Sequence, residues 1–140
     1  MKSLKFKIKV NAPKEKVWDS LWQDANYRKW TSAFAEGSHA VSDWNEGSKI
    51  LFLGNENSGM YSIIEKKILN QEMIFKHMGE VKDGIETTSD WAGSKESYLL
   101  SETNGVTELN VELDSTDEFQ DYFNETFPKA LELVKQISEK

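Results

Sequence analysis

The chain has 140 residues, a mass of 16.1 kDa and no cysteine, which excludes disulfides, thiolate metal sites and cysteine nucleophiles. Its 24 acidic residues outnumber 17 basic ones, and the formal net charge is −7. Arg28 is the only arginine. A chain without a basic surplus binds nucleic acid and anionic membranes poorly, so we expect neither as a partner.

No stretch approaches the roughly 18 apolar residues of a membrane span. The first ten residues alternate between apolar and basic side chains, unlike the apolar core of a signal peptide. The sequence also shows no internal repeat, low-complexity tract or linker. We therefore expect residues 1–140 to form a single soluble, cytoplasmic domain.

Local patterns predict a strand followed by two helices in the first 30 residues. Residues 3–10 place apolar side chains on one face of a strand and lysines on the other. Asn11 is a suitable helix cap and Pro13 suits a first helical turn. We expect one helix from there to about residue 23 and a second from Asp24 to about Trp30.

From residue 38 onward the apolar residues recur with a period of two, which indicates strands. We expect strands at residues 39–44, 48–53, 60–69, 72–78, 96–103 and 106–113, with a loop at 84–93. Asn104-Gly105 lies between the last two, and this dipeptide favours a tight hairpin because both residues tolerate positive φ.

The C-terminal segment predicts a long amphipathic helix of about twenty residues, starting after a capping box at Ser115–Glu118. Hairpin-length connections exclude a parallel sheet. The expected fold class is α+β. It consists of a curved antiparallel sheet of about six to seven strands wrapped around the C-terminal helix, with two short helices after the first strand.

Several stretches in this order resemble the helix-grip superfamily of START-like (SRPBCC) domains, and within it the bacterial branch of heat-shock-ATPase-activator homologues. They are Ala12-Pro13, Val17-Trp18, Trp30, Gly47–Ile50, Met73–His77, Glu96–Leu100, Asn104–Leu109 and Phe127–Leu131. The resemblance implies a deep apolar cavity between the sheet and the long helix. Members bind lipids, hormones or polyketides, and a minority are cyclases, dehydratases or hydrolases.

The leading hypothesis is therefore a hydrophobic, aromatic or lipid-like ligand in that cavity, with no cofactor and no metal. The expected ligand-binding residues are Trp30, Phe34, Trp44, Phe52, Tyr61, Ile63, Phe75, His77, Tyr98, Leu100, Phe123 and Phe127. No catalytic residue is assigned, and His77, Tyr98 and Glu65 are the only candidates for acid–base chemistry.

Strand parity underlies these assignments. His77 alternates with Met73 and Phe75 and should point inward with them, where it either contacts a ligand or is satisfied by backbone or water. Glu65 alternates with Tyr61 and Ile63. An inward carboxylate would have a raised pKa, whereas a glutamate at the end of a strand reaches solvent. His39 and His77 have no acidic third ligand at a suitable spacing for a metal.

The sequence is also compatible with a co-chaperone-like protein-interaction module, or with a cyclase- or dehydratase-type enzyme that uses cavity His, Tyr and Glu. Asp90-Trp91 would form either a lid over the cavity or an anchored surface loop. A homodimer would form through an exposed strand or an outer apolar face at Leu51 and Leu53. The acidic residues between 112 and 125 would form a docking face, a calcium site or a solvated surface.

Overall fold

Eight strands and three α-helices make up the computed structural model, which describes all 140 residues. In chain order they are β1 (Lys2–Val10), α1 (Lys14–Trp22), α2 (Asp24–Thr31), β2 (His39–Val41), β3 (Lys49–Leu53), β4 (Gly59–Ile68), β5 (Glu72–Lys82), β6 (Ile85–Thr88), β7 (Ser94–Thr103), β8 (Val106–Ser115) and α3 (Gln120–Ser138). Short 3₁₀ turns occupy Asn55–Asn57 and Asp117–Phe119.

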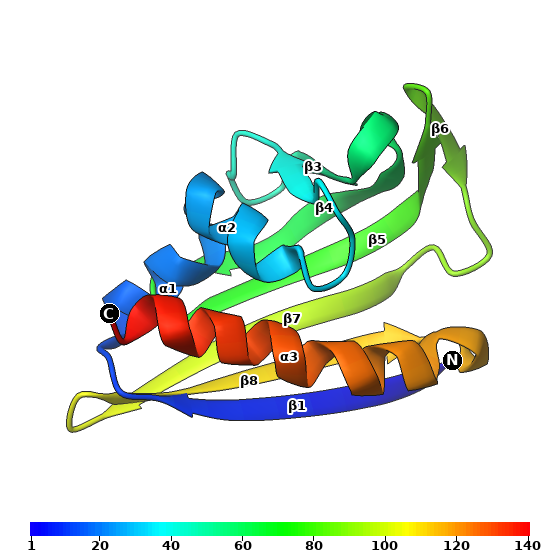
Figure 1. The fold of residues 1–140 in the computed structure, drawn as a ribbon. Helices are drawn as coiled ribbons and strands as arrows, with labels where there is room; N and C mark the ends of the chain where they lie inside the picture. Colours follow the sequence, from blue (N-terminus) through cyan, green and yellow to red (C-terminus); the bar gives the residue numbers. More distant parts are fainter.

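The strands form one antiparallel sheet in the order β1-β8-β7-β5-β4-β3-β2, and β6 pairs with the end of β5. Helix α3 runs along the sheet in front of β7, β8 and β1, and α1 and α2 lie beside it (Figure 1). This is the α+β architecture expected from the sequence. None of the helices is long and apolar enough to cross a membrane.

Two local patterns are confirmed in detail. In β1, Leu4 and Val10 are buried while the intervening lysines are exposed. The β7–β8 hairpin turns at Asn104 and Gly105, whose φ angles are 52° and 80°. Both angles are positive, as a two-residue hairpin turn requires.

The helix starts differ from the expectation because long-range contacts replace the local caps. Helix α1 begins after Pro13, and its first free N–H, that of Lys14, donates to Glu102 Oε1 at 2.8 Å. Asn11 is therefore not the cap. The capping box at Ser115 is also wrong, because Ser115 belongs to β8, where it pairs with Lys2.

The loop expected at 84–93 is partly wrong, because residues 85–88 form the additional strand β6. Asp83 and Gly84 have φ angles of 52° and 80° and turn β5 into β6. All four residues of β6 are exposed, so the segment has no alternating pattern to read. Strand β2 is shorter than expected, and Trp44 lies beyond it with a φ of 64°.

Two register shifts between β4 and β5 decide which side chains face the helices. Ser62 pairs with His77, and Tyr61 pairs with Gly79, so Met78 is an extra residue in β5. Ile64 pairs with Phe75 and Lys66 pairs with Ile74, which makes Glu65 an extra residue in β4. Bulges of this kind bend a strand and increase its twist, and here they lie on either side of the pair formed by Ser62 and His77.

The core fills the space between the concave face of the sheet and the three helices. Its largest fully buried side chains come from both layers and include Trp30, Phe75, Tyr98, Leu109 and Val134. Burial of this apolar surface is the main force that holds the helices on the sheet.

Gly79 provides a test of the bulged register. A Cβ atom at Gly79 would lie 2.0 Å from the Thr87 carbonyl oxygen and 2.8 Å from Tyr61 Cε1. Gly79→Ala should therefore lower the free energy of unfolding by about 2 kcal/mol or more. At Gly54, which has a φ of −108°, the nearest atom would be 3.7 Å away. Gly54→Ala should stay within about 1 kcal/mol of wild type. Equal losses in denaturant unfolding would contradict the assigned register.

Candidate functional site

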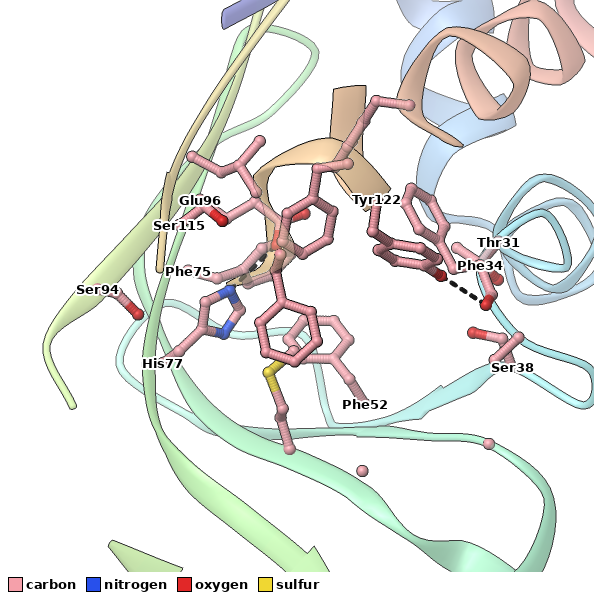
Figure 2. A pocket seen from close by; sticks show the side chains of 18 of the residues that line it. Thr31, Phe34, Ser38, Phe52, Phe75, His77, Ser94, Glu96, Ser115 and Tyr122 are labelled. Atoms are coloured by element: carbon pink, nitrogen blue, oxygen red, sulfur yellow. Dashed lines mark hydrogen bonds and ion pairs between the residues drawn. The ribbon is translucent and has the colours of Figure 1, made fainter. Parts of the chain in front are cut away.

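A cavity of about 490 Å³ lies between the concave face of the sheet and the helices α2 and α3. Aromatic side chains from both layers form most of its wall, and Figure 2 shows Phe52, Phe75 and His77 on the sheet side, opposite Phe34 and Tyr122. The structure brings together these residues from the predicted set: Trp30, Phe34, Phe52, Phe75, His77, Tyr98, Phe123 and Phe127.

Four residues of the predicted set lie elsewhere. Trp44 packs on Trp22 with ring centroids 5.8 Å apart and lines a smaller pocket of about 240 Å³. Leu100 is buried in the core without reaching the cavity. The other two, Tyr61 and Ile63, lie on the outer face of β4, where the Tyr61 hydroxyl bonds to Thr88 Oγ1 at 3.0 Å and Ile63 is 37% exposed.

The inward orientation expected for Tyr61 and Ile63 is wrong by one residue, and of the two positions considered for Glu65 the solvent-facing one is observed. Ser62 and Ile64 are fully buried instead, and Glu65 forms an ion pair with Lys95 at 3.0 Å on the outer face. Apolar residues occupy both odd and even positions of β4, so the sequence pattern alone did not show which of the two sets faces the core. The outer position expected for Leu53 is also wrong, because Leu53 is buried and lines the cavity.

A chain of hydrogen bonds crosses three neighbouring strands at the cavity wall. Ser62 Oγ lies 2.6 Å from His77 Nδ1, and His77 Nε2 lies 3.0 Å from Glu96 Oε1. The Tyr98 hydroxyl donates to the other oxygen of Glu96. His77, Glu96 and Tyr98 line the cavity, whereas Ser62 lies behind them. The candidate acid–base residues His77 and Tyr98 are therefore joined through Glu96.

Ser62 orients the imidazole of this chain. Ser62 is fully buried, and His77 Nδ1 is the only partner of its hydroxyl. A buried polar group without a partner is costly, so this contact fixes the orientation of the ring and points Nε2 at Glu96. Glu96 therefore accepts hydrogen bonds from His77 Nε2 and from the Tyr98 hydroxyl.

Two buried phenols surround this carboxylate. Burial raises the pKa of Tyr98 well above its ordinary value of 10.0, and the negative charge of Glu96 raises it further. Burial and the same carboxylate also raise the pKa of Tyr27, which lies on α2 and lines the cavity. The Tyr27 hydroxyl has no hydrogen-bond partner within the protein, so it is free to contact a molecule in the cavity.

Glu96 and Tyr27 line the cavity but were not among the residues predicted from the sequence. Glu96 was accessible from parity, because it lies two residues before Tyr98 on the same strand. Tyr27 lies on a helix between Trp22 and Trp30, in a segment with too few turns to show its buried face clearly.

The remaining candidates divide between the cavity and the surface. Trp91 lines the cavity, so the lid at Asp90-Trp91 stays a prediction. His39 lies away from His77 and its Nδ1 contacts the Gly37 carbonyl oxygen at 2.8 Å. No group of three or more His, Asp or Glu side chains is arranged to hold a metal ion.

Comparison with known proteins supports the fold. No protein-family model matches the sequence, and no curated protein matches it either. Among solved structures, the Aha1 dimer from Colwellia psychrerythraea is similar, with a TM-score of 0.72, 21% identity, and coverage of 99% of this chain and 97% of that one. MLL2253 from Mesorhizobium loti has a TM-score of 0.77 at 13% identity and covers 97% of this chain and 96% of that one.

CalU16 from Micromonospora echinospora has a TM-score of 0.71 at 17% identity, covering 97% of this chain and 75% of that one. At sequence identities this low, the structural similarity establishes a shared fold. The chain therefore shares the fold of these proteins, which is the helix-grip fold that its sequence motifs suggested.

The two buried phenols predict a pH dependence of stability. Their neutral forms are favoured in the folded state, so stability is intact below the ordinary tyrosine pKa and falls as the pH rises above about 10. Tyr98→Phe should flatten this decline in denaturant unfolding, and Tyr61→Phe on the outer face should not. An absorbance titration in which all 4 tyrosines of the folded protein ionise together near their ordinary pKa would contradict the assignment.

Proposed function

We propose that the chain binds a hydrophobic small molecule in the cavity between the sheet and α3. The observation that carries this proposal is the cavity itself, which is lined by rings and left unfilled by side chains. Its volume of about 490 Å³ falls in the range of ligand pockets, roughly 300–1,000 Å³. Apolar burial would supply most of the affinity, at about 25 cal/mol per Å².

The phenylalanines of α3 form a wall of the cavity and do not plug it. Phe127 stacks on Phe6 at 4.9 Å and meets Phe34 at 4.8 Å, and Phe123 lies 5.9 Å from Phe127. These contacts tie the rings to β1, to the segment after α2 and to one another. Their positions leave the space in front of His77 and Glu96 open to a ligand.

The hydrogen-bonded chain supports a second candidate function. His77, Glu96 and Tyr98 reach the cavity from adjacent strands, and linked groups of this kind can pass a proton to or from a bound molecule. A cyclase- or dehydratase-type enzyme would use them in place of Glu65, which faces outward. Loss of turnover in a His77→Gln variant that still binds its substrate would distinguish this function from simple binding.

Protein interaction is a further proposal, because one structural neighbour is an Aha1 dimer. In this chain the outer face of the sheet carries exposed apolar residues, including Val41, Ile63 and Leu99, which supports a homodimer through that face. Sedimentation equilibrium of the wild type and of Ile63→Lys tests it. A wild type that remains monomeric at high concentration would exclude a stable homodimer.

Ser38 at the cavity wall provides a test of ligand binding. Ser38→Trp should place a large ring in the cavity and weaken binding of the neutral probe N-phenylnaphthylamine by about tenfold or more. Ser32→Trp is a matched control, because Ser32 is exposed and does not line the cavity. Fluorescence titration measures both. A wild type that gives no saturable binding, or equal binding by the two variants, would contradict the proposed function.

A further inference from the structure

We propose that the cavity selects an organic ammonium, that is, a molecule with an apolar, ring-bearing body and a protonated amine that contacts Glu96. This inference rests on the proposed binding function and names the chemical class of its ligand. Three observations carry it: the charges that line the cavity, the absence of a lysine or arginine beside Glu96, and the free acceptor on Tyr27.

Apart from His77, the charged side chains that line the cavity are all acidic. They are Glu80, Glu96 and Asp114, and neither a lysine nor an arginine contributes to the wall. Glu80 is exposed, and Asp114 Oδ2 accepts the Lys95 backbone N–H at 3.0 Å. Glu96 is the member whose oxygens are shared with the buried residues His77 and Tyr98, so its charge dominates the interior.

No lysine or arginine balances the charge of Glu96. His77 is its only basic neighbour within 4.0 Å, and the other nitrogen of that imidazole contacts the Ser62 hydroxyl. The nearest residue in the sequence, Lys95, extends to the opposite face of the sheet, where it pairs with Glu65 at 3.0 Å. The side chain of Glu96 is only 19% exposed. A carboxylate this buried is expensive unless a charge pairs with it.

The surroundings of Glu96 suit an ammonium group better than any other head group. An ammonium has three N–H donors, and Glu96 can still accept one or more of them beside its bonds to His77 and Tyr98. The Tyr27 hydroxyl supplies another oxygen, since Tyr27 is 6% exposed, lines the cavity and has no partner in the protein.

Aromatic rings surround these oxygens. Trp22 meets Tyr98 at 4.9 Å, and Tyr27 meets Trp30 at 5.4 Å. Ring faces attract cations, and the attraction is stronger when water is excluded. An anionic head group would instead meet the Glu96 carboxylate with no lysine or arginine to separate the two charges. Figure 2 shows Glu96 beside His77 at the wall, with Phe52 and Phe75 next to them.

The test uses three probes that share one ring system: naphthylethylamine, naphthylethanol and naphthylacetate. Isothermal titration at neutral pH gives the affinity of each for the full chain. We expect the amine to bind about tenfold or more tightly than the alcohol, and the acetate to bind most weakly. The ratio of amine to alcohol affinity in the wild type needs no variant, so it stays informative even if a substitution impairs folding.

Two variants assign the preference to Glu96. Glu96→Gln should remove most of the amine preference, so that the ratio of amine to alcohol affinity falls close to one. Glu65→Gln makes the same change of charge on the outer face and should leave the preference intact. Thermal unfolding checks that both variants are folded.

The outcomes separate the two proposals. Alcohol binding with no preference for the amine, or tighter binding of the acetate, overturns the ammonium assignment and leaves the binding function standing. An amine preference that survives Glu96→Gln also overturns it. Failure of all three probes to bind saturably overturns the binding function and the ammonium assignment together.

Discussion

The Glu96 carboxylate inside an aromatic cavity is the constraint on which the surrounding structure depends. Its two oxygens are satisfied from two strands, by His77 on β5 and by Tyr98 on β7 itself. His77 is in turn oriented by Ser62 on β4. A slip of one residue in either strand pair would turn these side chains to opposite faces, so the polar chain and the sheet register specify each other.

The bulges make this register compatible with a curved sheet. The extra residues at Met78 and Glu65 lie on either side of the segment where Ser62 pairs with His77. Each bulge bends its strand, and the sheet curves around α3 (Figure 1). Regular pairing between the bulges keeps the polar chain aligned. The curvature leaves more space on the concave face than the side chains of α3 fill, which is the physical origin of the cavity.

The sequence predicted those features that depend on local chemistry, namely the alternation in β1, the turn at Asn104-Gly105 and the amphipathic α3. It failed where a partner distant in the chain decides the outcome. Glu102, which is distant from α1 in the sequence, accepts the hydrogen bond of the first free N–H of that helix. In β4, the set of residues that faces inward includes Ser62, whose hydroxyl bonds to His77 on the neighbouring strand. Apolar residues occur at both odd and even positions of β4, so the sequence pattern did not identify the inward set. Most of the cavity rings were predictable because they are large and regularly spaced, whereas the acidic character of the site depended on recognising Glu96.

Glu65 and Glu96 show why the buried carboxylate points to function more than to stability. Glu65 lies outside the cavity and forms an ion pair with Lys95 on the solvent-facing side of the sheet. Glu96 is adjacent to that same lysine in the chain, yet it faces the cavity, where His77 and Tyr98 donate to it. An apolar residue at this position would remove the cost of desolvation. The carboxylate therefore costs stability at a site open to a ligand, as is common where binding or catalysis requires a charged group inside a cavity.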